Sequence, residues 1–252
     1  MSLGFSICFM VGKLAAVALW CHGGYTFWGA ALFFGADLLM VYALLVPSAQ
    51  GLVRVFTRFE TREREVWLTI DDGPDPEDTP RILDALDQFG ARGTFFFIGE
   101  KAEKYPEWVV AVVQRGHEVA HHTHTHPDAS FWCASPRRLA KELDLALTAL
   151  APARPRAFRS PVGIKHPLLS WALRRRNLVY VGWTLRSWDS TAQSVQQVVD
   201  QVMPRVRPGS ILLFHEGPRL QPGIRVHALK EVLRHLQAQG FRCVIPETRH
   251  LR

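Results

Sequence analysis

The chain has 252 residues, of which 48% are hydrophobic and 21% charged, and its formal net charge is +7. This length suits one globular domain with an additional segment, and its four cysteines are too few and too scattered for a disulfide framework. The basic balance suits an anionic membrane surface or substrate, whereas the lack of a zinc-finger or RNP motif argues against nucleic acid as a partner.

Two apolar segments come first. Residues 3–20 and 27–46 are each long enough to cross a hydrocarbon core of about 30 Å as helices, and a His-Gly-Gly-Tyr turn separates them. No Lys or Arg precedes the first segment and the second follows at once, so we expect a transmembrane helical hairpin over residues 1–50 rather than a cleaved signal peptide. Lys13 and Asp37, the only charges in the two segments, would lie at similar depth in antiparallel helices, and we expect them to pair.

A basic stretch follows the second apolar segment. Its four arginines are Arg54, Arg58, Arg62 and Arg64, whereas the turn between the two apolar segments has no Lys or Arg. Positive residues mark the cytoplasmic side of a membrane protein, so we expect the following domain to face the cytoplasm at the inner membrane. We assign residues 51–65 to a basic juxtamembrane linker, with a short interfacial helix over residues 52–59.

The remainder, residues 66–252, alternates short apolar runs with amphipathic stretches and reads as one domain. The strands we expect lie at 66–71, 94–98, 117–120, 178–183, 210–215 and 241–245. The helices we expect lie at 79–89, 106–115, 136–150, 167–176, 195–206 and 227–239. Such alternation is typical of an α/β protein with a parallel sheet or barrel, whose site forms at the carboxyl ends of the strands.

Metal-ligating side chains cluster after two of these strands. Asp71 and Asp72 end the first strand before a Gly-Pro break, which lets both carboxylates converge on one pocket, although such a pair also suits a turn or a helix cap. Residues 117–126 hold five of the eleven histidines, and His122 and His126 have i,i+4 spacing in the loop after a strand. Two histidines and a carboxylate leave positions open for water and substrate, so we assign a catalytic metal to Asp72, His122 and His126.

Five motifs occur in order along the chain. They are Thr-Ile-Asp-Asp-Gly-Pro at 69–74, His-Thr-x-x-His-Pro at 122–127, Arg-x-Pro-x-Gly at 159–163, Trp-Thr-x-x-x-x-Asp at 183–189 and Leu-Phe-His at 213–215. This set resembles the polysaccharide deacetylase (NodB-homology) family, carbohydrate esterase family 4, over about residues 66–246. The resemblance implies a distorted (β/α) barrel with seven strands as the catalytic domain, residues 66–252, and a metal-assisted hydrolysis of an amide bond.

The same resemblance implies a role for each site residue. Asp71 is expected to be the general base, and Arg159 to keep it ionised and aimed. His215 is expected to be the general acid that protonates the departing amine, with Asp189 fixing its tautomer and raising its pKa. The backbone N–H of Val162 is expected to donate to the oxyanion. The expected cofactor is a divalent metal ion, usually zinc in this family.

The sugar-binding wall is where the sequence departs from the family pattern. The residues that we expect to contact the sugar are Pro161, Val162, Gly163, Trp183 and Trp188. Val162 stands where the family often has Tyr, Ser190 where Trp often follows the fourth-motif Asp, and Glu216 where Asp often follows the last His. These differences concern the choice of sugar more than the reaction.

The expected activity is hydrolysis of the N-acyl group, most simply N-acetyl, of an amino sugar in a polysaccharide, an oligosaccharide or a lipid-linked glycan. A deformylase or a cyclic-amide hydrolase would use the same residues, so the sequence leaves these alternatives open. A catalytically silent membrane module that binds glycolipid is a further alternative, against which the complete set of site residues argues. The sequence does not determine the oligomeric state.

Overall fold

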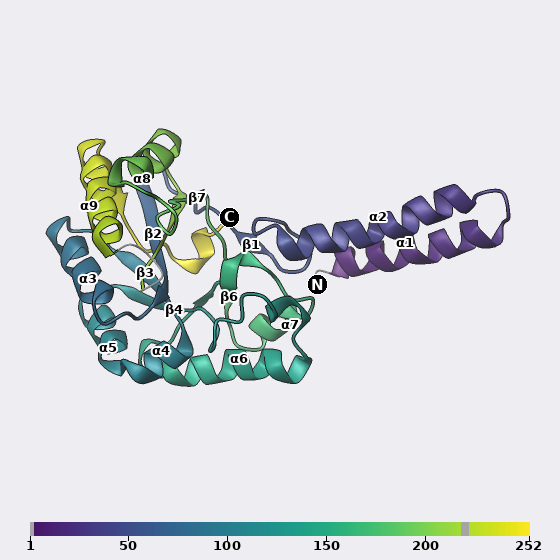
Figure 1. The fold of residues 1–252 in the computed structure, drawn as a ribbon, viewed down its shortest axis with the longest axis horizontal. Coiled ribbons are helices and arrows are strands. Elements are labelled where there is room, and N and C mark those ends of the chain that lie inside the picture. The colour runs from purple at the N-terminus through teal and green to yellow at the C-terminus, as the bar shows by residue number, and fades with distance from the viewer. Residues whose placement is uncertain (1–2, 218–221) are drawn as a thin grey trace.

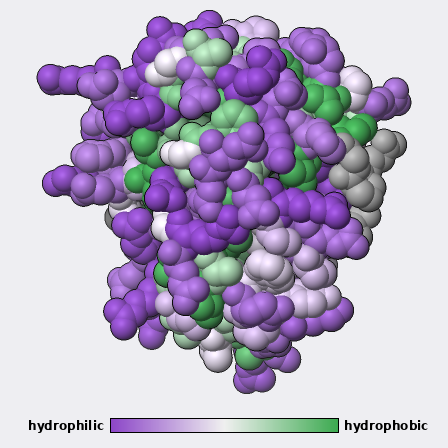
Figure 2. All heavy atoms as spheres, turned by 90° about the vertical axis from the view of Figure 1, so that its left-hand side faces the viewer, coloured by the Kyte–Doolittle hydropathy of each residue, from purple (hydrophilic) through white to green (hydrophobic). Residues whose placement is uncertain are grey.

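An apolar helical hairpin projects from an α/β domain (Figure 1). The computed structural model describes residues 3–217 and 222–252. The hairpin consists of α1 (Leu3–Cys21) and α2 (Thr26–Leu45), which carry most of the exposed large hydrophobic side chains found in the described residues. By length and composition α2 is able to cross a membrane, and α1 contributes a shorter apolar helix, Ile7–Cys21. In contrast, the face of the domain turned away from the hairpin is covered mainly by hydrophilic side chains (Figure 2).

The two charges of the hairpin form an ion pair across its helices. Lys13 Nζ lies 2.7 Å from Asp37 Oδ2 and donates a second hydrogen bond of 2.9 Å to the carbonyl oxygen of Phe33. The ammonium also lies 3.4 Å from the centroid of the Phe33 ring. The pairing predicted from the positions of the two residues is confirmed, and it gives each charge a partner in an otherwise apolar segment.

The domain is built on a curled parallel sheet, confirming the distorted barrel. Its strand order is β1-β6-β5-β4-β3-β2-β8-β7, with β9 pairing β2. The strands are β1 (Val55–Phe56), β2 (Glu65–Gly73), β3 (Gly93–Phe97), β4 (Glu118–His121), β5 (Ala157–Phe158), β6 (Val179–Val181), β7 (Leu185–Arg186), β8 (Ser210–His215) and β9 (Arg242–Cys243). The helices are α3 (Asp78–Gln88), α4 (Gly99–Lys104), α5 (Pro106–Gln114), α6 (Pro136–Ala149), α7 (Leu169–Arg174), α8 (Val195–Val202) and α9 (Pro222–Ala238). The described residues form nine strands, two more than the seven that the resemblance implies, and β1, β5, β7 and β9 have only two residues each.

Every predicted strand and helix between residues 66 and 245 is present, with bounds that differ by a few residues. The interfacial helix predicted over residues 52–59 is wrong, because β1 lies there and pairs with β6 in parallel, Val55 opposite Tyr180. Val53 and Val55 are buried while Arg54 between them is exposed, which is the period of a strand. The stretch assigned as a linker therefore contributes a strand to the sheet.

Successive side chains of the central strand β2 point to opposite faces of the sheet and belong to two separate apolar layers. Val66, Leu68 and Ile70 pack against the surrounding helices, whereas Trp67 belongs to a second cluster with residues of β3, β4, β6 and β8. Thr69 lies two residues beyond Trp67 on the same side of the strand and donates to the carbonyl oxygen of Leu212. The next position on that side is Asp71, so the pleat of β2 delivers this carboxylate to the end of the barrel interior.

Candidate active site

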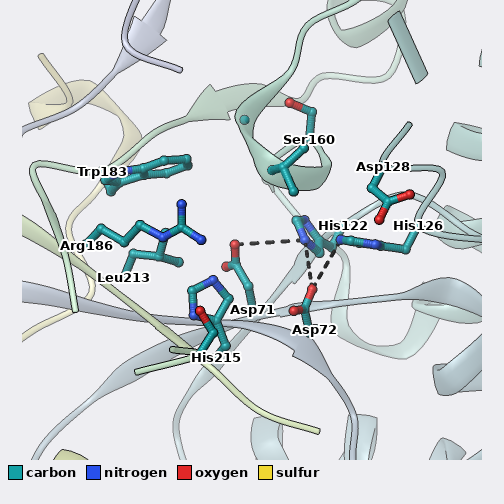
Figure 3. Close-up of a pocket in the computed structure, with 13 residues that line it drawn as sticks. Asp71, Asp72, His122, His126, Asp128, Ser160, Trp183, Arg186, Leu213 and His215 are labelled. Carbon is teal, nitrogen blue, oxygen red and sulfur yellow. Dashed lines mark ion pairs between the residues drawn. The ribbon is translucent and has the colours of Figure 1, made fainter. Parts of the chain in front are cut away.

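Two adjacent carboxylates leave the carboxyl end of β2. The register between β2 and β3 shifts between Asp71 and Gly73, and Asp72 has a φ of 74°. In a regular strand two neighbouring side chains would point to opposite faces of the sheet. The irregularity removes that alternation, and both carboxylates line one pocket (Figure 3). The predicted convergence of the two carboxylates is confirmed.

Asp72 lies against two histidines from the loop after β4. Its Oδ1 is 3.3 Å from His122 Nε2 and 3.2 Å from His126 Nε2. These are the only His, Cys, Asp or Glu residues within the described ranges whose ligand atoms gather closely enough to share one ion. Ligands about 2.0–2.2 Å from a tetrahedral ion are separated by about 3.3–3.5 Å. The three side chains therefore fit a divalent metal ion with little rearrangement.

The hydrogen bond on the far side of the His122 ring sets its tautomer. His122 Nδ1 lies 2.8 Å from the carbonyl oxygen of Arg159. A carbonyl oxygen only accepts, so Nδ1 carries a hydrogen, and Nε2 is the ring atom that faces Asp72 and would ligate an ion. This arrangement, a backbone carbonyl behind a ligating imidazole, is common at metal sites because it fixes the ring and raises its basicity.

The other histidines of the cluster have structural surroundings. His121 is fully buried, its Nε2 lies 2.9 Å from the carbonyl oxygen of Leu143, and its Nδ1 accepts from the backbone of Thr123. Burial lowers the pKa of His121 to about 4, so its ring is neutral. His117 and His124 are also buried outside the group that gathers around Asp72. His121 and His124 are neighbours of the site, as expected, whereas His117 lies at the other end of the sheet, where its Nδ1 accepts from the backbone N–H of Gly93 at the start of β3.

Asp71 is held by a buried arginine. Arg159 Nη1 lies 2.6 Å from Asp71 Oδ1, and the guanidinium is inaccessible to solvent. Its other N–H groups donate to Thr69 Oγ1 and to the carbonyl oxygens of Val181 and Gly182. Because the guanidinium is bonded on every edge, it is fixed in place and holds Asp71 in one orientation.

His215, at the end of β8, lines the pocket beside Asp71, its partner in the register of β2 and β8. Its Nδ1 lies 2.7 Å from Asp189 Oδ1, and its backbone N–H donates to Asp189 Oδ2 at 2.7 Å. Burial alone would lower the pKa of His215, but the charge and hydrogen bond of Asp189 outweigh it and raise that pKa above the ordinary histidine value. With Nδ1 engaged, Nε2 is the atom that remains for the pocket.

A tight turn after β5 forms another part of the pocket wall. Val162 has a φ of 48°, and its backbone N–H donates no hydrogen bond to any part of the chain that the structure describes. Its neighbour Gly163, with a φ of 77°, also lines the pocket. A free N–H in a strained turn at the pocket wall is an arrangement that suits stabilisation of an oxyanion.

The same turn is fastened to the base of the hairpin. The backbone N–H of Lys165 donates to the carbonyl oxygen of Leu44, and its Nζ donates to that of Val46 at 2.5 Å. Burial lowers the pKa of Lys165 to about 8. A side chain added at Gly163 would come within 2.7 Å of Pro47, which follows α2. The pocket wall and the end of α2 are thus one packed unit.

Replacing Gly163 by alanine is expected to lower kcat by about tenfold to a hundredfold, since small displacements of positioned groups have effects of that size. The added Cβ would meet Pro47 at 2.7 Å and the Trp183 ring at 2.8 Å, so the turn that carries the Val162 N–H must shift. Gly35→Ala is the matched control, because a Cβ there meets nothing within 4 Å. Steady-state kinetics of the two variants check this, and equal activity would contradict the role of the turn.

The pocket includes most, though not all, of the residues predicted from the sequence. Its lining comprises Asp71, Asp72, His122, His126, Asp128, Ser160, Val162, Gly163, Trp183, Arg186, Ser190, Leu213 and His215. Arg159 and Asp189 lie behind this lining and act through Asp71 and His215. Pro161 is buried, and Trp188 lies outside the lining with its ring 4.4 Å from the guanidinium carbon of Arg186.

Five lining residues were not predicted: Asp128, Ser160, Arg186, Ser190 and Leu213. All five lie within a motif or next to one, so proximity to the motifs was the available signal. Arg186 is the most consequential omission, because it stands at an unspecified position of the fourth motif and its charged side chain enters the pocket (Figure 3).

Comparison with known proteins adds an independent line of observation. A family model described as polysaccharide deacetylase matches residues 58–181. The chain is 37% identical over 169 residues to a chitooligosaccharide deacetylase of Sinorhizobium fredii, covering 66% of this chain and 78% of that protein. It is 36% identical over 182 residues to a peptidoglycan-N-acetylglucosamine deacetylase of Bacillus cereus, covering 71% of this chain and 66% of that protein.

Solved structures show the same likeness in three dimensions. The fold superposes with a TM-score of 0.68 on a peptidoglycan N-acetylglucosamine deacetylase in complex with 4-naphthalen-1-yl-N-oxidanyl-benzamide. The two chains are 32% identical, and the match covers 75% of this chain and 89% of the other.

Proposed function

Because this chain belongs to the polysaccharide deacetylase family, whose members hydrolyse the amide bond of N-acetyl groups, we propose that it deacetylates an amino sugar carried by a membrane lipid. The observation that carries the proposal is the meeting of Asp71, the Asp72–His122–His126 group and His215 in one pocket that adjoins the base of an apolar hairpin. The relatives named above act on glycans that contain N-acetylglucosamine, which supports that sugar or a close analogue as the substrate.

We assign the cofactor to Asp72, His122 and His126, and zinc is the ion that best suits two imidazoles and one carboxylate. A divalent ion bound there would lower the pKa of a water molecule and polarise the acyl carbonyl. The open positions of such a site would face the cavity between Val162 and His215, both of which line it.

Asp71 and His215 each carry out one of the two proton transfers that the hydrolysis requires. Asp71, held in place by Arg159, accepts a proton from the attacking water. The backbone N–H of Val162 donates to the oxygen that becomes negative as the tetrahedral intermediate forms. His215, held as the imidazolium by Asp189, then gives a proton from Nε2 to the departing amine nitrogen. The C–N bond breaks, and the products are acetate and a free amino sugar.

Replacing Asp189 by asparagine is expected to move the alkaline limb of the pH–kcat profile to lower pH. The carboxylate raises the pKa of His215, and a general acid works only while protonated, so activity falls as pH rises through that pKa. Asparagine removes the negative charge that stabilises the imidazolium, and the limb therefore begins earlier. Profiles of the two proteins test this, and an unmoved limb would exclude His215 as the general acid.

The hairpin, proposed to comprise residues 1–50, supports a substrate at the membrane. Its base contacts the turn that forms the pocket wall, so the site lies close to the plane where α2 leaves the apolar phase. The arginines that follow α2 place the catalytic domain, residues 66–252, on the cytoplasmic face of the inner membrane in this proposal. A reporter fused after Arg252 and active only outside the cell would contradict that orientation.

The direct test is turnover by the purified full-length protein, supplied with zinc and held in lipid nanodiscs. Lipid-linked N-acetylglucosamine should release acetate and a free amine, both detectable by mass spectrometry. Release of formate from an N-formyl substrate, or of a ring-opened product, would support the alternative hydrolyses on the same scaffold. Absence of any product, together with absence of bound metal, would support a silent glycolipid-binding module.

A further inference from the structure

One cation in the catalytic pocket has no partner in the protein. Arg186, in β7, lines the pocket, and its Nε is buried without a hydrogen-bond acceptor. Throughout residues 3–217 and 222–252 its guanidinium donates to no acceptor and forms no ion pair. Arg159, the other arginine of the site, contrasts with it, since all its edges are bonded.

The surroundings hold the Arg186 side chain without satisfying its N–H groups. Its guanidinium carbon lies 4.4 Å from the centroid of the exposed Trp188 ring, so one face of the cation is supported by an aromatic side chain. The guanidinium lies between Trp183 and Asp71, directed into the cavity (Figure 3). Its N–H edges are therefore presented to the space that the substrate enters.

The nearby carboxylates are already engaged by other groups. Asp71 is paired with Arg159 at 2.6 Å, and both oxygens of Asp189 accept hydrogen bonds from His215. Neither forms an ion pair with Arg186. A half-buried guanidinium without a counter-ion is unfavourable, and its forked N–H groups match the paired oxygens of a phosphate or a carboxylate.

We propose that Arg186 binds an anionic group of the substrate, next to the sugar whose N-acetyl group is removed. This inference rests on the proposed function and adds a substrate class to it: a glycan that bears a phosphate or a carboxylate beside the reacting sugar. Phosphate is the favoured anion, because the pocket that Arg186 lines also includes Gly163, which is packed on Pro47 at the base of the hairpin. A sugar joined to a membrane lipid through phosphate would place that anion beside the pocket.

The test is equilibrium binding, which does not depend on turnover. Full-length protein with zinc, in nanodiscs of uncharged phosphatidylcholine, is titrated calorimetrically with three N-acetylglucosamine probes. The first is linked to citronellol through a phosphodiester, the second is the uncharged citronellyl glycoside, and the third is the citronellyl glycoside of a disaccharide with glucuronic acid. The wild-type protein should bind the phosphodiester about 10- to 100-fold more tightly than the uncharged glycoside, as expected for charged hydrogen bonds.

Two substitutions of Arg186 distinguish the effect of its positive charge on binding from the effect of its forked N–H groups. Arg186→Gln should reduce the preference for the phosphodiester over the uncharged glycoside by at least about tenfold, and Arg186→Lys should keep part of it, because lysine retains the charge without the fork. Arg205→Gln removes the same charge from the exposed turn after α8 and should leave binding of all three probes unchanged.

Equal affinity of the wild-type protein for charged and uncharged probes, or an equal loss on both in Arg186→Gln, would overturn the assignment. A preference for the glucuronate probe that depends on Arg186 would keep the anion site and identify its anion as carboxylate. Hydrolysis is followed separately by acetate release. If the phosphate preference depends on Arg186 but no acetate appears, the proposed deacetylation fails while the anion site stands.

Discussion

Replacing Asp71 by asparagine is expected to lower kcat by about a thousandfold while the metal content of the protein stays unchanged, since general-base catalysis contributes about 10²- to 10⁴-fold. Asparagine has nearly the same shape as aspartate but does not accept the proton that the attacking water must lose. Arg159 retains its hydrogen bonds to Thr69, Val181 and Gly182, so the pocket should keep its form.

Metal retention in this variant follows from the distances. Asp71 Oδ2 lies 3.9 Å from His122 Nε2, and Asp71 is not part of the group whose ligand atoms gather around Asp72. Elemental analysis of the purified variant should therefore find as much ion as in the wild-type protein, alongside greatly reduced acetate release. Loss of the ion together with the activity would reassign Asp71 as a ligand, and full activity would remove it from the mechanism.

Replacing His126 by alanine is expected to abolish both activity and metal binding at ambient metal concentrations. His126 is one of the three protein side chains assigned as ligands. Mutation of a residue that only hydrogen-bonds to a ligand lowers metal affinity by about 10- to 100-fold, so removal of a ligand itself should lower it further. A high concentration of added zinc should restore part of the activity, because Asp72 and His122 are still present.

His124→Ala is the matched control for this prediction. His124 lies in the same histidine-rich loop and is buried, but it does not belong to the group around Asp72. Elemental analysis should find the ion retained in His124→Ala and absent from His126→Ala. The reverse pattern would show that the wrong histidines had been assigned to the ion.

The fold was predictable from the sequence wherever local patterns and tertiary packing agree. Strand β2 is apolar on both faces and ends in Asp71 and Asp72, and the structure has it where the apolar run predicts it. Helix α6 begins after Ser135, whose side chain accepts from the backbone of Arg138, followed by a proline in its first turn. Both signals are contained in a few neighbouring residues.

The segment before the barrel was not predictable in this way. Arg54 and Arg58 are four residues apart among apolar neighbours, a spacing that suits a helix, but the structure has β1 there. Strand β1 forms because the edge of β6 offers hydrogen-bonding partners, and because Val55 enters an apolar cluster with Phe158 and Tyr180. Partners that lie more than a hundred residues away in the chain leave no trace in the local pattern.

Some features of the candidate site could also be predicted from local sequence, whereas others depend on residues that are distant in the chain. The candidate ion-binding group follows from residue type and spacing, since His122 and His126 lie four apart after a strand. The orphaned guanidinium of Arg186 and the packing of Gly163 on Pro47 depend on which side chains the fold brings together. Neither feature follows from neighbouring residues in the sequence, because each joins side chains from separate elements of the fold.

The proposed mechanism requires that Asp72, His122 and His126 bind one ion together. The most direct measurement is the anomalous diffraction of a crystal of the full-length protein grown with zinc. We expect a single strong peak about 2.0–2.2 Å from a carboxylate oxygen of Asp72 and from Nε2 of both His122 and His126. A pocket without a peak, or an ion held by other side chains while these three stay apart, would contradict it.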